Sequence, residues 1–183
     1  MSVGNTLKDG SVYKGDNLVL RKPRLEDGAK IHALVKSCKP LDVNSVYTYL
    51  LLCQHFADTC VVAEVHGQVV GFLSGYVLPP RRDRRDVFFV WQIAVDERCR
   101  GQSFGKRLLK EVLQRAFCRN CCFLETTITP SNNVSWILFR SFARDLATSY
   151  KECSCFSEGH FGQERHEAEH LFRVGPFDVN WVK

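Results

Sequence analysis

The sequence predicts one α/β (α+β) domain in which helices flank a mostly antiparallel central sheet. The chain has 183 residues, which is the usual length of a single domain. With 45% hydrophobic and 25% charged residues, it has the composition of a globular protein. Hydrophobic patterns of strand and helix period follow one another as strand, two helices, three strands, helix, strand, helix and one or two strands. That order is typical of three-layer packing.

The N-terminal part is predicted to hold a strand and a helix. Residues 1–16 are polar and have no hydrophobic period, which indicates a flexible leader before a single domain at 17–183. Residues 17–22 alternate around two leucines and predict a short strand that ends at a proline. Residues 26–38 place apolar side chains at helical spacing behind two acidic residues, and Pro40 ends this helix.

The middle of the chain is predicted to form a second helix and then three strands. The helix is expected to start at Asp42 or Asn44, because both residue types are good N-caps. Its apolar face would consist of Val46, Leu50, Cys53 and Ala57. The strands cover residues 59–65, 68–77 and 87–95. His66-Gly67 joins the first two strands and is typical of a tight hairpin.

The C-terminal part is predicted to form a helix, a strand, a helix and a closing strand. The first helix carries a stripe of Phe104, Leu108, Val112 and Ala116. The second begins at Pro130-Ser131 and carries Val134, Leu138, Phe142 and Leu146. The strands lie at residues 121–128 and 169–177, and the arginine-rich stretch at 81–85 belongs to an exposed loop.

Charge and hydropathy narrow the class of function. No apolar run reaches the roughly 18 residues that a membrane helix needs, and the N-terminal segment lacks the apolar core of a secretory signal. We therefore expect a soluble cytoplasmic protein that binds neither membrane nor nucleic acid. The net charge of +5 suits an anionic small ligand, because clustered Lys and Arg attract phosphate groups.

Cysteines and histidines raise the question of a metal. The nine cysteines are an odd number without an export signal, so reduced and mostly buried thiols are expected. Cys118-x-x-Cys121 with Cys153-x-Cys155 leaves a weak zinc alternative open. His166-Glu167-Ala168-Glu169-His170 matches the H-E-x-x-H zinc-protease motif, but the strand pattern that follows argues against the helix that this motif requires. We expect no metal.

The most informative segment is a turn within residues 91–106. An apolar strand leads into a glycine-containing turn, which then opens an amphipathic helix. Free N–H groups at such a helix start bind phosphate, and Arg100 and Lys106 add positive charge. Taken alone, the pattern fits a solvated turn as well as a phosphate site.

With the strand before it, this turn resembles the acetyl-CoA motif of the GCN5-related N-acetyltransferases (GNAT), Arg/Gln-x-x-Gly-x-Gly/Ala. Arg100, Phe104 and Gly105 fit the motif, whereas Ser103 occupies the position of the middle glycine. The resemblance implies a GNAT-type three-layer fold with acetyl-CoA as co-substrate. It implies CoA contacts from Ile93, Ala94, Val95, Arg100, Gly101, Gln102, Ser103, Phe104, Gly105, Lys106, Asn132 and Ser135.

Two of these contacts belong to a later segment. Asn132-x-x-Ser135 is similar to the start of the family's second CoA-contacting helix. On the same helix, Phe139 stands where many members have a tyrosine that protonates the leaving thiolate. That role therefore does not transfer to this chain.

Across residues 18–177 the chain also resembles the L-2,4-diaminobutyrate acetyltransferases of ectoine synthesis. The segments that carry this resemblance are 21–29, 40–45, 49–53, 55–60, 89–92, 123–127, 129–132, 160–162 and 175–177. The resemblance implies transfer of the acetyl group of acetyl-CoA to the 4-amino group of L-2,4-diaminobutyrate. It also implies a homodimer and a role in osmoprotection.

The implied reaction needs a proton acceptor, because an amine with a lysine-like pKa near 10 must be neutral before it attacks a thioester. Glu125 is the predicted base, since burial in its apolar strand would raise its pKa. Pairing with an arginine or exposure to solvent is its simpler structural explanation. His160 is predicted to orient the substrate or relay a proton. A backbone N–H within residues 93–95 would bind the carbonyl oxygen.

Four further residues are predicted to contact the substrate, which carries two ammonium groups and a carboxylate. Asp42 would hold an ammonium group, although a plain N-cap would look the same. Asn44 and Tyr47 lie nearby on the same segment and would position polar groups. Trp91 would wall the apolar stem of the amine, and would otherwise be a core residue.

Two alternatives stay open beside this function. Ser103 and Phe139 depart from the family pattern, which leaves room for an acyl-CoA-binding module without turnover. An acetyltransferase for another small amine is the second alternative. Thiol release in the presence of a panel of diamines would separate these possibilities.

Overall fold

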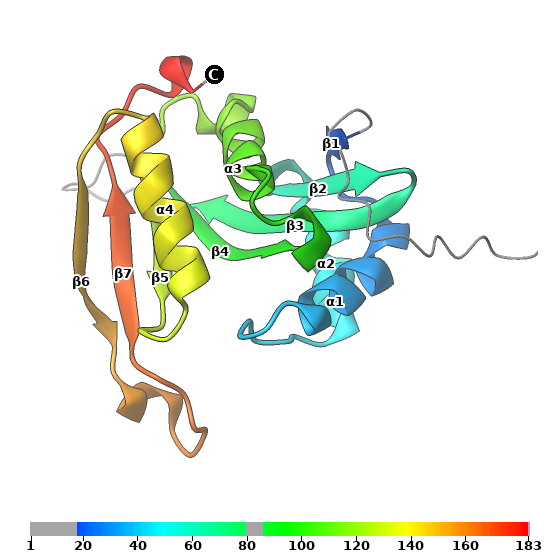
Figure 1. Cartoon of the computed structure of the whole chain (residues 1–183), viewed down its shortest axis with the longest axis horizontal. Helices are drawn as coiled ribbons and strands as arrows, with labels where there is room; N and C mark the ends of the chain where they lie inside the picture. Colours follow the sequence, from blue (N-terminus) through cyan, green and yellow to red (C-terminus); the bar gives the residue numbers. More distant parts are fainter. Residues whose placement is uncertain (1–17, 80–85, 183) are drawn as a thin grey trace, which may run out of the picture.

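The computed structural model describes residues 18–79 and 86–182 and shows a seven-stranded sheet (Figure 1). The strands are β1 (Leu18–Arg21), β2 (Cys60–Val65), β3 (Gln68–Val77), β4 (Val87–Val95), β5 (Phe123–Ile128), β6 (Tyr150–Phe156) and β7 (Glu169–Val174). Their order is β1-β2-β3-β4-β5-β7-β6, and all neighbours are antiparallel except β4 and β5. The predicted α/β class with a mostly antiparallel sheet is confirmed. The predicted leader at 1–16 and the arginine cluster at 81–85 lie outside the described residues.

Helices cover both faces of the sheet. In the described residues the α-helices are α1 (Gly28–Ser37), α2 (Val46–His55), α3 (Phe104–Leu113) and α4 (Asn133–Asp145). α1 and α2 lie on one face, and α3 and α4 lie on the other (Figure 1). Because side chains alternate along β2, Val61 and Ala63 belong to the core with α3, while Cys60 and Val62 belong to the core with α1 and α2. The result is the predicted three-layer arrangement.

Local sequence signals locate the central strands well. His66 and Gly67 have positive φ angles of 49° and 76°, as a type I′ hairpin turn requires. β4 spans residues 87–95, as predicted. β5 begins at Phe123 instead of residue 121, and β7 ends at Val174, where a Gly-Pro pair follows and proline has no N–H for the ladder.

The start of α2 differs from the predicted one. Ser45 is its N-cap, in place of Asp42 or Asn44, and the Ser45 hydroxyl accepts a hydrogen bond from the Thr48 N–H at 3.3 Å. An N-cap has extended backbone before the first turn, and Ser45 has it, with φ −63° and ψ 155°. The buried face therefore differs from the predicted stripe and consists of Tyr49, Leu52 and Cys53.

The start of α4 also differs, because Asn132 and not Pro130-Ser131 precedes its first turn. The Asn132 side chain accepts a hydrogen bond from the Ser135 N–H at 3.1 Å. Val134, predicted to face the core, is 58% exposed. The buried residues of α4 are Phe139, Phe142 and Ala143.

The cysteines and the H-E-x-x-H motif form no metal site within the described residues. All nine cysteines are free thiols, and six of them are buried. Residues 165–168 have no regular secondary structure and Glu169 begins β7, so the helix that the motif requires does not form. Within residues 18–79 and 86–182, no group of three or more His, Cys, Asp or Glu is placed to hold a metal ion. In that same part of the chain, no helix combines the length and apolar character that a bilayer crossing needs.

Candidate active site

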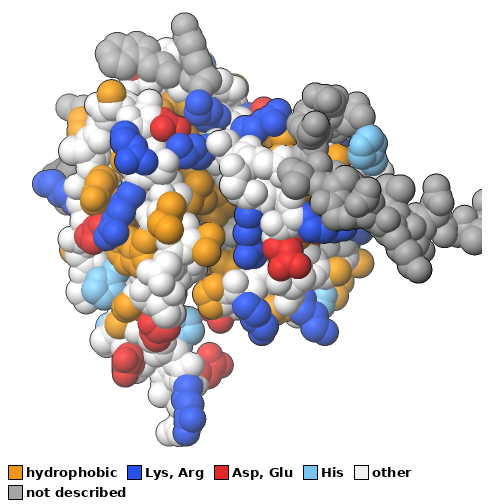
Figure 2. Space-filling model, viewed as in Figure 1, with side chains coloured by type: hydrophobic (Ala, Val, Ile, Leu, Met, Phe, Trp, Pro, Cys, Tyr) orange, Lys and Arg blue, Asp and Glu red, His pale blue; other side chains and the backbone are white. Residues whose placement is uncertain are grey.

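The site lies where the two central strands separate. β4 and β5 pair only through residues 87–89 and 123–125, so the rest of β4 has no β5 partner. Two adjoining cavities open there, with volumes of about 870 and 520 Å³. Residues shared by both walls are Pro40, Leu41, Ile93, Asn132 and Ser135. Figure 2 shows hydrophobic side chains along the hollow between the α4 side and the α1 side of the molecule.

A β-bulge in β4 directs a side chain to the larger cavity. Ser74 pairs with Gln92 and Gly75 pairs with Val90, so Trp91 is the extra residue of β4. Bulges re-aim side chains and are frequent beside active sites. Trp91 lines the larger cavity and is 47% exposed. Its ring is therefore accessible for contact with the apolar carbon chain of an amine substrate.

Glu125 lines the larger cavity from β5 and is fixed by an arginine. It is 6% exposed, and Arg173 Nη1 donates a hydrogen bond to its Oε1 at 2.8 Å. The two residues lie opposite each other on β5 and β7, which makes them a cross-strand ion pair. The Arg173 guanidinium also lies over the Phe123 ring at 4.0 Å. The carboxylate is therefore held rigidly at the cavity wall.

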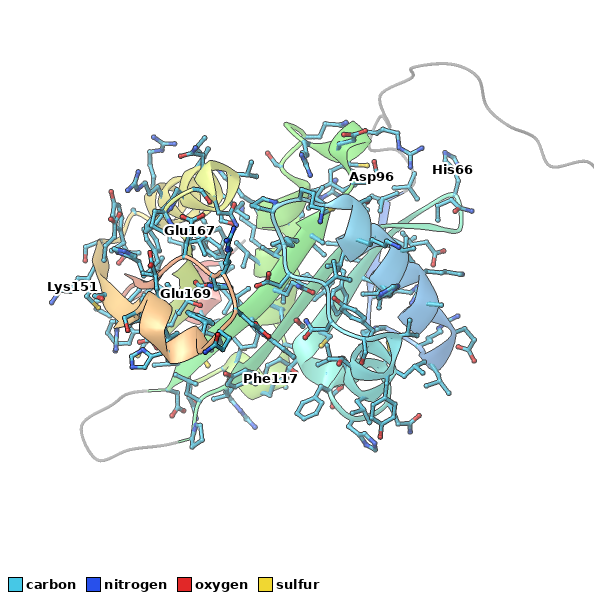
Figure 3. All side chains as sticks on the ribbon, turned by 90° about the horizontal axis from the view of Figure 1, so that it is seen from below. His66, Asp96, Phe117, Lys151, Glu167 and Glu169 are labelled. Carbon is cyan, nitrogen blue, oxygen red and sulfur yellow. The ribbon has the colours of Figure 1, made fainter. Side chains whose placement is uncertain are left out.

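Glu169 is a second carboxylate in this cavity, and sequence reasoning did not select it. It opens β7, and its Oε2 is buried without a hydrogen-bond partner. Burial raises the pKa of Glu169 above its ordinary value. Buried polar groups are normally paired, so an unpaired carboxylate oxygen at a cavity wall indicates a place for a ligand. In the view from below, Glu169 lies beside Glu167 (Figure 3).

His166 reaches the cavity in place of the predicted His160. Its Nε2 lies 3.2 Å from Asp42 Oδ2, and its Nδ1 lies 2.7 Å from the Glu167 carbonyl oxygen. The hydrogen bond to the Glu167 carbonyl raises the pKa of His166, and Asp42 acts in the same direction. The His166 ring also stacks on Phe161 with centroids 3.9 Å apart.

The structure places the predicted His160 in a short turn before β7. It is exposed in the 3-10 turn Glu158–Phe161, and its Nδ1 accepts a hydrogen bond from the Ser157 N–H at 3.0 Å. His160 therefore caps this turn, and it is not among the described residues that line either cavity.

The predicted substrate contacts are only partly brought together. Asp42 and Asn44 line the larger cavity with Trp91. Tyr47 is 67% exposed on the first turn of α2 and is not among the described lining residues. Because α2 begins after Ser45, its buried face consists of Tyr49, Leu52 and Cys53, and Tyr47 is not part of that face.

The smaller cavity collects the predicted CoA contacts. Of these, Gln102 is not a lining residue, and its Nε2 donates to the Arg98 carbonyl at 3.3 Å. The lining members of the predicted set are Ile93, Ala94, Val95, Arg100, Gly101, Ser103, Phe104, Gly105, Lys106, Asn132 and Ser135. The structure therefore brings all but one of the predicted CoA contacts together at one cavity.

The start of α3 has the geometry of an anion site. Ser103 is its N-cap in the left-handed region, with φ 62° and ψ 15°, and its side chain makes no capping hydrogen bond. The first N–H groups of a helix have no partner within it and carry the positive end of its dipole. Lys106 is paired with Asp145 at 2.8 Å, while Arg100 is exposed at the cavity. These groups fit a pyrophosphate.

Comparison with known proteins decides the family. Residues 29–143 match the model of the acetyltransferase (GNAT) family. The L-2,4-diaminobutyric acid acetyltransferase of Marinococcus halophilus is 42% identical over 97% of this chain and 99% of its own. That of Bordetella parapertussis is 48% identical over 94% of each. The chain belongs to the diaminobutyric acid acetyltransferases of the GNAT family.

The GNAT fold is also seen in a solved relative. Diaminobutyrate acetyltransferase EctA from Paenibacillus lautus, in complex with L-2,4-diaminobutyric acid and coenzyme A, matches with a TM-score of 0.82 at 35% identity. The match covers 89% of this chain and 97% of that chain. The predicted GNAT-type fold is confirmed.

Proposed function

We propose that this GNAT chain is an acyltransferase that moves the acetyl group of acetyl-CoA to the 4-amino group of L-2,4-diaminobutyrate. The observation that carries this proposal is the joining of two cavities: one holds Glu125 and Glu169, and the other holds the anion-binding start of α3. The names of the relatives and the ligands of the Paenibacillus lautus enzyme support the same substrates.

The larger cavity suits a substrate with two ammonium groups. Asp42, Glu125 and Glu169 supply three carboxylates around it. Glu125, held by Arg173, is the fixed anionic group that binds ammonium. Asn44 supplies a neutral polar group, and Trp91 covers the apolar stem. Tyr47, predicted to position a polar group of the substrate, is exposed and is not among the described residues that line this cavity.

Glu169 is the proton acceptor that the geometry favours. Sequence reasoning placed the base at Glu125, but that carboxylate is engaged by Arg173. Glu169 Oε1 lies 3.8 Å from His166 Nε2, while Glu169 Oε2 has no hydrogen-bond partner and the pKa of Glu169 is raised. Glu169 takes one proton from the 4-ammonium group, which leaves a neutral amine. The amine nitrogen then bonds to the thioester carbonyl carbon, the C–S bond breaks, and the second amine proton goes to the departing thiolate.

The thiolate needs no strong acid, because a thiol with a pKa of about 8.5 is a fairly good leaving group. Phe139, 1% exposed at the cavity wall, has no proton to give.

A β4 backbone N–H within residues 93–95 binds the thioester carbonyl oxygen. The N–H groups at the start of α3, from Ser103 onward, bind the pyrophosphate. His160 has no part in this scheme, and His166 is the histidine that lines the larger cavity.

We further propose the cellular setting that the resemblance implies. Residues 17–183 form a single domain, and the enzyme acts as a cytoplasmic homodimer in ectoine synthesis, which serves osmoprotection. Size-exclusion chromatography with light scattering tests the dimer, and a monomer at micromolar concentration contradicts it.

Thiol release tests the function directly. Acetyl-CoA is incubated with the protein and, in separate reactions, L-2,4-diaminobutyrate, ornithine, lysine and a polyamine. We expect rapid release of CoA with diaminobutyrate and a clear preference over the longer amino acids. Equal rates with all amines, or thiol release without an acetylated product, would contradict the proposal.

A further inference from the structure

A buried amide ties the central sheet to the edge of the larger cavity. Gln92 lies in β4, is 8% exposed and lines this cavity. Its Nε2 donates a hydrogen bond to the Asp42 carbonyl oxygen at 2.8 Å. The Tyr49 hydroxyl donates to Gln92 Oε1 at 3.1 Å. Because a backbone carbonyl only accepts, the amide nitrogen must face Asp42 and the amide oxygen must face Tyr49.

Tyr49 is itself fixed by the core between α2 and the sheet. It is 0% exposed, and its ring lies edge-on to Phe72 with centroids 6.1 Å apart. The Tyr49 ring also makes an edge-on contact with His32, with centroids 5.9 Å apart. The Tyr49 hydroxyl therefore has a defined place, and it orients the Gln92 amide.

Asp42 needs such an anchor, because residues 39–45 between α1 and α2 have no helix or strand. The Gln92 amide holds the Asp42 backbone at one side of the larger cavity. The Asp42 side chain contacts His166, with 3.2 Å between Asp42 Oδ2 and His166 Nε2. The carboxylate is thus placed by a bond at its backbone and a contact at its side chain.

We propose that Gln92 is a positioning residue for substrate recognition, which acts by holding Asp42 where its carboxylate binds a substrate ammonium group. Tyr49 sets the direction of the Gln92 amide. This role for Gln92 and Tyr49 rests on the proposed acetylation of diaminobutyrate. A direct contact between Gln92 and the substrate is the competing explanation.

A double-mutant cycle on KM separates these explanations. Asp42→Asn and Gln92→Met are made singly and together, and KM and kcat are measured for both substrates. Because Gln92 acts through Asp42, each single variant should raise KM for diaminobutyrate by about tenfold, and the double variant by no more than about tenfold. The values of kcat and of KM for acetyl-CoA should stay within about twofold of the wild type.

Tyr49→Phe keeps the aromatic packing and removes only the hydroxyl, so it carries the test if Gln92→Met does not fold. It should raise KM for diaminobutyrate about threefold, whereas Tyr150→Phe, on the edge strand β6, should leave it unchanged. The inference is overturned if KM for diaminobutyrate is unchanged in Tyr49→Phe and Gln92→Met. It is also overturned if the effects of Asp42→Asn and Gln92→Met on KM multiply in the double variant. Either result leaves the proposed function intact. A wild type that does not acetylate diaminobutyrate overturns the proposed function and this inference with it.

Discussion

His166 Nε2 lies 3.2 Å from Asp42 Oδ2, so two side chains that are 124 positions apart in the chain meet at the larger cavity. The other ring nitrogen, Nδ1, faces the Glu167 carbonyl oxygen at 2.7 Å. Both neighbours are acceptors, so the ring satisfies both only when it is protonated and donates twice. The segment before β7 is thereby tied to the segment before α2.

This contact predicts a pH-dependent contribution to stability. The pKa of His166 is raised above its ordinary value of 6.5. The stabilisation is therefore fully present below that ordinary value, and it is lost as the pH rises through the raised pKa. The thermal midpoints of the wild type and of His166→Gln should differ most at about pH 6 and converge by about pH 9. Parallel curves would contradict this. His66→Asn, in the β2–β3 turn, is the control whose difference should not follow this pattern.

Replacement of Glu169 tests the proton acceptor. Glu169→Gln should lower kcat by about 10²- to 10³-fold, in the range of general base catalysis, with little change in CoA affinity. In the wild type, kcat should rise as the pH rises through the raised pKa of Glu169, because the base must be ionised. A variant that keeps wild-type kcat across this range would place the base elsewhere.

Glu125→Gln tests the fixed carboxylate. It removes the anionic partner of Arg173 and the proposed ammonium site, so kcat/KM for diaminobutyrate should fall by about 10²-fold. Calorimetry should give a CoA dissociation constant within about twofold of the wild type. A variant with weakened CoA binding and unchanged use of diaminobutyrate would contradict the assignment.

Ser103 tests the backbone of the anion-binding turn. A non-glycine residue in the left-handed region costs about 1 kcal/mol, and the Ser103 side chain makes no capping bond that a substitution would lose. Ser103→Gly relieves this strain, and the larger unfolded-state entropy of glycine offsets part of the gain, so the free energy of unfolding should rise by about 0.5 kcal/mol. Ser103→Ala, which keeps the strain, should change it by less than about 0.5 kcal/mol in urea titrations. Equal effects of the two variants would show that the turn is unstrained.

Ser131 and Glu167 form a second tie, between the residues before α4 and those before β7. Glu167 accepts one hydrogen bond from the Ser131 N–H at 3.1 Å and another from the Ser131 hydroxyl. Both residues are exposed, so the tie contributes modestly. Ser131→Ala and Glu167→Ala should show a coupling of about 0.5–1 kcal/mol in the free energy of unfolding. Strictly additive effects would mean that the tie does not persist in solution.

The features predicted well from the sequence are those set by neighbours in the chain. His66-Gly67 fixes its hairpin by its own backbone, and the turn after β4 leads into α3 as the local pattern predicts. The buried faces of α2 and α4 were harder to predict, because each depends on which residue caps the helix. Ser45 and Asn132 do so, and a shift of the first turn changes which side chains face inward.

The larger cavity could be predicted only in part, because distant strands build it. Glu125 stood out as an acidic residue in an apolar strand. The pairing of Glu125 with Arg173 depends on β7 lying between β5 and β6, which no local pattern states. His166 and Glu169 were visible only as part of a metalloprotease-like motif. The alternation of β7, which places Glu169 and Leu171 on the cavity side, is the sequence signal that could have identified Glu169.

The position of the acetyl group in the product tests the central claim most directly. The wild type is incubated with acetyl-CoA and L-2,4-diaminobutyrate, and the product is examined by long-range proton–carbon NMR. The account predicts a correlation from the acetyl carbonyl carbon to the protons on C4. A correlation to the proton on C2, or no acetylated amino acid at all, would contradict it.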